Sequence, residues 1–171
     1  MFSAEYMGVM SVGKKIEKWF VDLLTKQEIQ GISFDTQGRV ENKEYNLTGY
    51  YDLRIIKQDS LLEKGGQLIY EIKSKHSRSF HYMDKKGQGA QFSHQMQLWS
   101  YLWFGEIEEG RIVYVSKDDL SILEYPVFRN DQNIKEKVMR ELDILNRAWK
   151  EKLPPEPLTD KKDWRIQYCR Y

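Results

Sequence analysis

Charged side chains alternate with apolar ones near the end of one apolar run of the sequence. In the segment LIYEIK, Glu71 and Lys73 are two residues apart, so in an extended strand they project from one face, while Tyr70 and Ile72 project from the other. A second carboxylate, Asp52, follows the segment GYY in an earlier apolar run. Two carboxylates on neighbouring strands repel each other unless a cation lies between them, and Mg²⁺ prefers such oxygen ligands. The pattern favours metal-assisted chemistry, although the alternating pair alone is more typical of a solvent-facing strand.

A third group of polar side chains has helical spacing. Gln97 and Tyr101 are four residues apart, and His94 precedes Gln97 by three, so all three share one helical face. Such a face can contact a substrate or brace a neighbouring site. The simpler alternative is a polar edge on a packed helix, and a lone helical histidine is more often packed or solvated.

The elements that must position these residues follow from the spacing of apolar residues. Helical spacing predicts a first helix over residues 11–27, with Ser11 as its N-cap and Gly31 ending it or the turn after it. The predicted apolar stripe of that helix comprises Val12, Ile16, Trp19, Phe20, Leu23 and Leu24.

Later segments alternate between strand and helix patterns. The predicted strands are 39–47, 49–56, 67–74 after a turn at 63–66, and two within 111–128 joined at 117–119. Two further helices are predicted over about 86–104 and over 131–152, the second with an apolar stripe of Ile134, Val138, Leu142, Leu145 and Trp149. The resulting order, α-β-β-β-α-β-β-α, predicts an α/β (α+β) domain with a central mixed sheet flanked by helices.

Length and composition fit one globular domain. The chain has 171 residues, of which 40% are hydrophobic and 13% aromatic, so we expect a single domain over 1–153 and a proline-containing tail over 154–171. Its 27 basic and 26 acidic residues nearly cancel, so attraction to nucleic acid must come from local clustering. No cationic leader and no apolar run of ~18 residues occurs, and we expect a cytoplasmic protein without membrane contact.

Three segments resemble, in order, the motifs of the RecB-like branch of the PD-(D/E)XK nuclease superfamily, whose members include CRISPR-associated and AddB-type nucleases. They are GYYD ending at Asp52, EIK at 71–73 and QLWSY at 97–101, and the resemblance runs from about residue 11 to about 128. It implies a restriction-endonuclease-like core and a Mg²⁺- or Mn²⁺-dependent DNase without sequence preference. Such an enzyme would be an exonuclease acting on DNA ends or single strands in recombination, repair or replication, with recombination or replication proteins as possible partners.

The resemblance also implies roles for individual residues. Asp52 and Glu71 would ligate the metal, together with the backbone carbonyl of Ile72. Lys73 would orient or help deprotonate the attacking water and offset charge on the scissile phosphate, as a positioned ammonium can.

Further roles are implied on the two helices. Gln97 and Tyr101 would contact DNA or brace the site, and His94 could contact a phosphate. Many relatives carry a metal-ligating histidine a turn after a glycine in the first helix, but here Gly13 is followed four residues on by Glu17. Glu17 is either a further metal ligand or a solvated helix charge.

A basic segment follows the EIK motif directly. Between residues 73 and 86, five basic side chains accompany one acid and several aromatic residues. We expect a loop beside the site that binds DNA, with Gly87 and Gly89 giving it freedom; a solvated loop is the alternative. The DNA-binding side chains expected there, besides Lys73, are Lys75, Arg78, Lys85 and Lys86.

The C-terminal segment DWRIQYCRY resembles the edge of the iron-sulfur module of some relatives. Cys169 is the only cysteine, and such a cluster normally needs four thiolates, so we expect no cluster. Two alternatives to a nuclease stay open: a catalytically weak nuclease-fold protein that binds DNA or acts as an assembly factor, and an α+β interaction domain whose charged strand is only its solvent face.

Overall fold

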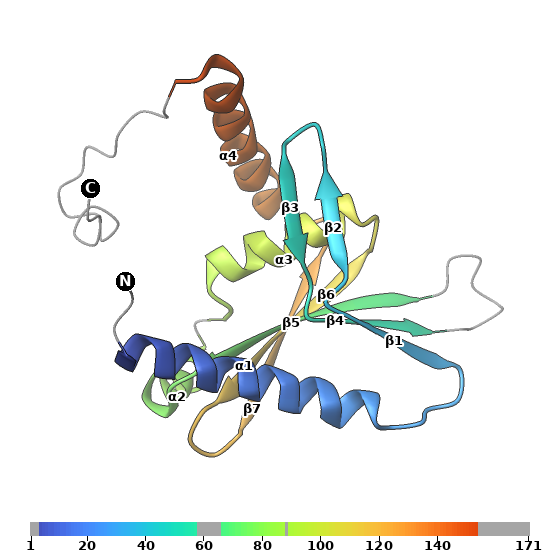
Figure 1. The fold of residues 1–171 in the computed structure, drawn as a ribbon, viewed down its shortest axis with the longest axis vertical. Helices are drawn as coiled ribbons and strands as arrows, with labels where there is room; N and C mark the ends of the chain where they lie inside the picture. The colour runs from blue at the N-terminus through green and yellow to red at the C-terminus, as the bar shows by residue number, and fades with distance from the viewer. Residues whose placement is uncertain (1–3, 58–65, 88, 154–171) are drawn as a thin grey trace.

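The protein is a layered α/β structure in which helices cover both faces of one sheet (Figure 1). This computed structural model describes residues 4–57, 66–87 and 89–153. The helices are α1 (Ala4–Thr25), α2 (Ser77–Lys86), α3 (Phe92–Phe104) and α4 (Gln132–Glu151). The strands are β1 (Ile32–Thr36), β2 (Arg39–Asn42), β3 (Leu47–Tyr50), β4 (Leu53–Lys57), β5 (Gln67–Lys75), β6 (Glu109–Ser116) and β7 (Ile122–Phe128).

The central sheet has the strand order β1-β4-β5-β6-β7 and mixed direction. Strands β5 and β6 are parallel, whereas the other neighbours in this sheet are antiparallel. The parallel pair needs a crossover connection, which α2 and α3 supply. Strands β2 and β3 form a separate two-stranded hairpin, which extends beside α4 in Figure 1.

Strand β6 shows why the sheet is covered on both faces. Val113 and Val115 pack with Ile16 and Phe20 of α1, whereas Ile112 and Tyr114 belong to the core on the side of α3 and α4. None of these four β6 side chains is exposed to solvent. A run of consecutive apolar residues in a central strand, here 112–115, is typical of a sheet buried on both sides.

These features confirm the predicted fold class, a mixed sheet flanked by helices, and they are consistent with a restriction-endonuclease-like fold. The strand boundaries differ from the prediction in two places. Strand β1 was not predicted, and the strands predicted over 39–47 and 49–56 are three strands, β2, β3 and β4, of which the first two form a hairpin. The turn of that hairpin includes Asn46 with φ 50°, a conformation that asparagine tolerates.

Helix α1 begins earlier than expected, so the prediction that Ser11 is its N-cap is wrong. Gly31, with φ 76°, lies in the turn that follows the helix, as expected. The predicted apolar stripe is only partly buried, because Val12, Trp19 and Leu23 are 44%, 36% and 45% exposed. Helix α1 rests on the sheet through a narrower stripe centred on Ile16 and Phe20.

The helix predicted over about 86–104 begins later, as α3 at Phe92, and a separate helix, α2, precedes it and ends at Lys86. Gly87 and Gly89 both adopt left-handed φ angles, 58° and 68°, and Gly87 is the C-cap of α2. Glycine takes this conformation without steric cost, so it ends α2 and allows the chain to turn before α3.

The prediction of a basic loop between residues 73 and 86 is also wrong in part, because residues 77–86 form α2. Phe80 and Met83 are 3% and 6% exposed and belong to the core on the α3 side. Their spacing of three residues is the helical signal in this segment. The basic residues of α2 are therefore carried on an element whose other face is anchored in the core.

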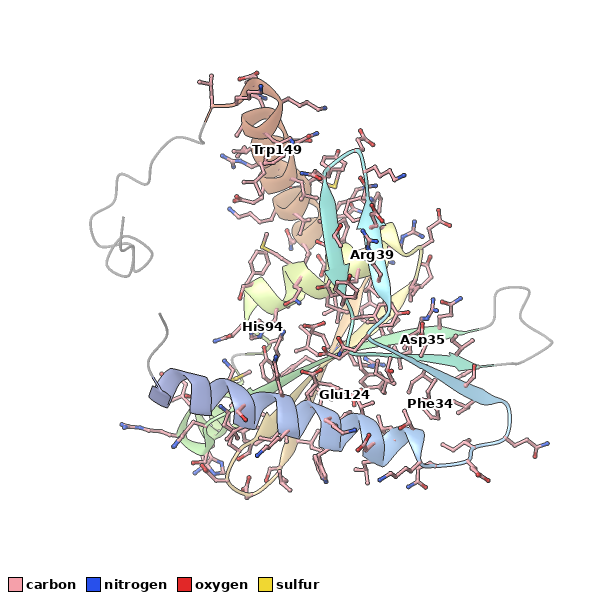
Figure 2. All side chains as sticks on the ribbon, viewed as in Figure 1. Phe34, Asp35, Arg39, His94, Glu124 and Trp149 are labelled. Carbon is pink, nitrogen blue, oxygen red and sulfur yellow. The ribbon has the colours of Figure 1, made fainter. Side chains whose placement is uncertain are left out.

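Helix α4 agrees with its predicted bounds to within a residue. The side chain of Asp131 caps it by accepting a hydrogen bond from the Ile134 N–H at 3.1 Å. Only the first part of the predicted stripe is buried: Leu145 and Trp149 are 56% and 71% exposed, and Figure 2 shows Trp149 on the part of α4 that projects from the domain.

The described helices contain no segment long and apolar enough to cross a bilayer. The C-terminal tail with Cys169, and most of the turn predicted at 63–66, lie outside the described residues.

Candidate active site

Asp52 immediately precedes β4, an inner strand of the central sheet. Strands β4 and β5 pair antiparallel with Leu53 opposite Tyr70, so the next position along the register brings Asp52 alongside Glu71. The Asp52 carboxylate accepts a hydrogen bond from the backbone N–H of Ile72 at 2.6 Å. The pairing of the two strands therefore fixes one carboxylate beside the other.

Glu71 is a buried carboxylate with an uneven set of partners. Its side chain is 2% exposed, and its Oε1 accepts hydrogen bonds from Lys73 Nζ at 2.5 Å and from Gln97 Nε2 at 2.8 Å. Its other oxygen, Oε2, is buried and has no hydrogen-bond partner among the described residues. A buried carboxylate oxygen without a donor is costly, and a bound cation is one kind of group that can offset that cost.

The two carboxylates disfavour each other's charge. Burial, followed by the charge of Glu71, raises the pKa of Asp52 to about 7. Burial also raises the pKa of Glu71, although the ammonium of Lys73 opposes that rise. Like charges held together away from water are the arrangement that a divalent cation relieves.

Helix α3 braces Glu71 through Gln97. Gln97 Nε2 donates to Tyr101 Oη at 3.0 Å as well as to Glu71. Tyr101 is 7% exposed and lies against Gly49 of β3, where an added Cβ would stand 2.5 Å from the tyrosine ring. Two roles were expected for Gln97 and Tyr101, contact with DNA or bracing of the site. Their hydrogen bonds lead to the Glu71 carboxylate, which is the arrangement of bracing residues.

Glu17 faces the same region from α1. It accepts a hydrogen bond from Gln37 Nε2 at 2.9 Å, and its charge contributes to the raised pKa values of both Asp52 and Glu71. Glu17 and Asp52 also line a cleft of about 930 Å³ between α1 and the first strands of the sheet. Other residues lining this cleft include Lys14, Lys18, Phe34 and Gln37.

The donor set of the site fits a divalent metal in part. Within the described part of the chain, no three His, Cys, Asp or Glu side chains are close enough to hold an ion together, so Glu17 does not join Asp52 and Glu71 as a third ligand in this conformation. Two carboxylates with a backbone carbonyl nonetheless match the habit of Mg²⁺, which binds through one or two carboxylates and keeps several waters. The unpartnered Glu71 Oε2 is consistent with such a fit.

The basic residues lie at the C-terminal end of β5 and on α2. Lys75 is the last residue of β5, and with Arg78 of α2 it lines a second cleft of about 350 Å³. Lys85 is exposed on α2, and Lys86 ends that helix. The expected DNA-binding residues that follow Lys73 therefore lie on two elements. Lys75 ends β5, two residues after Lys73, and the others lie on α2, which begins four residues after Lys73.

One polar network of the site was not anticipated from the sequence. His94 Nδ1 lies 2.7 Å from the hydroxyl of Tyr114, which also accepts the backbone N–H of Gln91 at 3.0 Å. Tyr114 sits in the middle of an apolar strand, so sequence spacing marks it only as a core residue. Figure 2 shows His94 near the end of α3 that faces α1.

Comparison with solved structures identifies relatives of the fold. The structure of the protein SSO0001 has a TM-score of 0.58 and 19% identity, covering 96% of this chain and 68% of that one. The alkaline exonuclease LHK-Exo from Laribacter hongkongensis has a TM-score of 0.53 and 15% identity, covering 84% and 73%. The structure of LHK-Exo in complex with dAMP has a TM-score of 0.55 and 15% identity, and the match covers 89% of this chain and 75% of that one. At this identity the similarity shows a shared fold.

No protein-family model matches the sequence, and no curated protein is similar enough in sequence to match it.

Proposed function

We propose that this protein is a metal-dependent DNA nuclease of the RecB-like PD-(D/E)XK type. The observation that carries the proposal is the buried Glu71, whose Oε2 has no partner among the described residues while Asp52 lies beside it. The order of the three sequence motifs and the fold shared with LHK-Exo support the same proposal.

The metal would be Mg²⁺ or Mn²⁺. Asp52, Glu71 and the backbone carbonyl of Ile72 would hold it, since they supply the oxygen ligands that these ions prefer. When bound, the cation would neutralise charge on the phosphate and make an attacking water more acidic. Binding would also relieve the repulsion that raises the pKa of Asp52.

Lys73 is the proposed catalytic cation. Its ammonium contacts Glu71 Oε1 at 2.5 Å, and its side chain is 26% exposed, so it can reach solvent and substrate while the carboxylate orients it. There it would position the attacking water and stabilise the extra negative charge of the transition state. Gln97 and Tyr101 keep Glu71 in place during this step.

The proposed substrate is DNA, as single strands or as duplex ends. The basic residues Lys75, Arg78 and Lys85 adjoin the site on β5 and α2 and could track a phosphate backbone. LHK-Exo, which has this fold, is an exonuclease and was solved with dAMP. We therefore propose exonuclease activity without sequence preference, used in recombination, repair or replication.

A second candidate is a catalytically weak DNA-binding or assembly factor with the same fold. It is favoured by the absence, in the part of the chain that the structure describes, of three acidic or histidine side chains grouped around one ion. The interaction-domain alternative is disfavoured, because Glu71 is buried and its strand face is not a solvent face.

The deciding experiment incubates end-labelled single-stranded and duplex DNA with Mg²⁺ or Mn²⁺. Wild-type protein should release short products, and Asp52→Asn and Lys73→Met should not. Calorimetric titration of the metal alone should show binding to the wild type and to Lys73→Met but not to Asp52→Asn. DNA binding without cleavage by the wild type would support the assembly factor, and cleavage that survives both substitutions would refute the site.

A further inference from the structure

The hydroxyl of Tyr114 has a restricted set of hydrogen-bonding options. Tyr114 is fully buried, and its hydroxyl already accepts the backbone N–H of Gln91 at 3.0 Å. A buried hydroxyl must also place its own proton on an acceptor. Among the described residues the group in reach that can accept it is Nδ1 of His94, at 2.7 Å.

This arrangement selects one form of the imidazole. If Tyr114 donates to Nδ1, that nitrogen carries no proton, so the neutral ring must carry its proton on Nε2. Burial and the neighbouring charges of Lys73 and Lys75 lower the pKa of His94 to about 4, so the ring is neutral at ordinary pH. The rings of His94 and Tyr114 also lie 5.7 Å apart in a tilted contact, which limits rotation of the imidazole.

The charged neighbours of His94 are ammonium groups. Both Lys73 and Lys75 are near enough to influence its charge. Lys75 additionally lies over the ring of Tyr114, with its Nζ 5.5 Å from the centroid, and it lines the 350 Å³ cleft together with Arg78 and Gln91. A neutral N–H donor placed among ammonium groups adds a directional hydrogen bond for an anion without adding repulsive charge.

We propose that Tyr114 fixes His94 as the Nε2–H tautomer so that His94 donates a hydrogen bond to a phosphate oxygen of the bound nucleic acid, beside Lys75. The proposal rests on the proposed function, because it concerns how that site holds its substrate. His94 acts in binding and is not a proton donor or acceptor in the reaction. Tyr114 is a positioning residue that acts through His94.

The tautomer can be measured directly. The chain has three histidines, so ¹⁵N–¹H correlation spectra of histidine-labelled protein can be assigned by the signal that disappears in His94→Gln. We expect His94 to carry its proton on Nε2 in the wild type and to become a mixture of tautomers in Tyr114→Phe. Tyr125→Phe is the matched control, since Tyr125 contacts the Tyr114 ring edge-on and should leave the tautomer unchanged. A wild-type His94 protonated on Nδ1 would overturn the proposal.

Binding tests the role of the fixed donor. The probe is a fluorescein-labelled single strand of about 12 nucleotides in EDTA, so that cleavage does not interfere. In His94→Gln the side-chain amide nitrogen can stand where Nε2 stood, so affinity should stay within about twofold. In His94→Asn the shorter amide should reach only the Nδ1 position, and affinity should fall roughly five- to tenfold. Tyr114→Phe should show a smaller loss.

The outcomes separate this inference from the proposed function. Equal affinity of His94→Asn and the wild type, with cleavage intact, would overturn the inference while the nuclease proposal stands. A wild type that neither binds nor cuts DNA would overturn both. Thermal melting of each variant shows whether a loss of affinity reflects unfolding, and a folded His94→Asn with weakened binding supports the proposal.

Discussion

Gln97 of α3 donates a hydrogen bond to Oε1 of Glu71 on β5, at 2.8 Å and across 26 residues of sequence. Lys73 donates to the same oxygen, so both partners converge on Oε1, and Oε2 has no partner within residues 4–57, 66–87 and 89–153. A helix and a strand thereby hold a buried carboxylate in one orientation, with its second oxygen available to a ligand.

Replacing Lys73 by methionine should lower DNA cleavage at least ~100-fold, because the site loses the cation that stabilises developing charge. The free energy of unfolding should also fall by about 2 kcal/mol, because Glu71 remains buried without its ion pair. Cleavage assays and chemical denaturation measure the two effects. Lys57→Met, which removes an exposed lysine of β4, is the control and should change neither; a fully active Lys73→Met would contradict the assignment.

Asp52→Asn should make the metal-free protein more stable by about 1 kcal/mol, since it removes one of two buried like charges while keeping an acceptor for the Ile72 N–H. It should also abolish the stabilisation that Mg²⁺ or Mn²⁺ gives the wild type, which follows from ligand binding to the folded state. Thermal melting in EDTA and in metal tests both. Asp143→Asn, on an exposed position of α4, should keep the metal effect, and a metal effect that persists in Asp52→Asn would argue against this ligand.

Gly49→Ala should destabilise the fold by about 1–3 kcal/mol and reduce cleavage, because the added methyl group would overlap the ring of Tyr101. Displacement of that ring disturbs the hydrogen bond that Tyr101 shares with Gln97, and through it Glu71. Gly66→Ala is the matched control, since its nearest neighbour would be 3.7 Å away, an ordinary contact. Equal stability and activity of the two variants would contradict the proposed bracing.

His94 should make stability depend on pH. Its folded-state pKa is lowered to about 4 from 6.5, so the unfolded chain binds a proton at pH 5 that the folded protein binds only weakly. The stability that His94 contributes is therefore present above pH 6.5 and is lost as the pH falls toward 4.

Denaturation of wild type and His94→Gln at pH 7 and pH 5 measures this effect. The wild type should lose about 1 kcal/mol more than the variant over that interval, a figure reduced from the full shift because the ring is partly exposed. Lys73, Lys75 and Tyr114, which neighbour His94 in the wild type, are present in both proteins, so the comparison isolates the titration of His94. Identical pH dependence of the two proteins would rule out a buried neutral His94.

Removal of the basic side chains Arg78 and Lys85 should weaken single-stranded DNA binding and make it less sensitive to salt. The slope of log affinity against log salt concentration should fall by about 0.7 for each phosphate that the variant no longer neutralises. Lys43→Ala, in the turn between β2 and β3, should leave the slope unchanged, because that hairpin extends away from α2 in Figure 1. An unchanged slope in Arg78→Ala and Lys85→Ala would place the nucleic acid elsewhere.

Much of the local pattern was visible in the sequence. The alternation of Glu71 and Lys73 with Tyr70 and Ile72 sets which side chains share a strand face, and the four-residue step from Gln97 to Tyr101 sets a shared helical face. The mixed α/β class followed from the order of apolar patterns. The prediction of elements was wrong at the start of α1, at β1, at the β2–β3 hairpin and at α2, because short-range spacing does not show the turns and the burial that the packed chain imposes there.

The sequence alone determined which chemical groups are available and which of them share a face, because side-chain direction in a strand or helix depends only on local periodicity. The tertiary structure decided which groups meet: Asp52 reaches Ile72, Gln97 reaches Glu71, and His94 reaches Tyr114. These pairs are 20 or more residues apart, and their contact depends on strand register and on how α3 packs against the sheet. Burial shifts the pKa values of Asp52, Glu71 and His94. It arises only when the helices pack against the sheet.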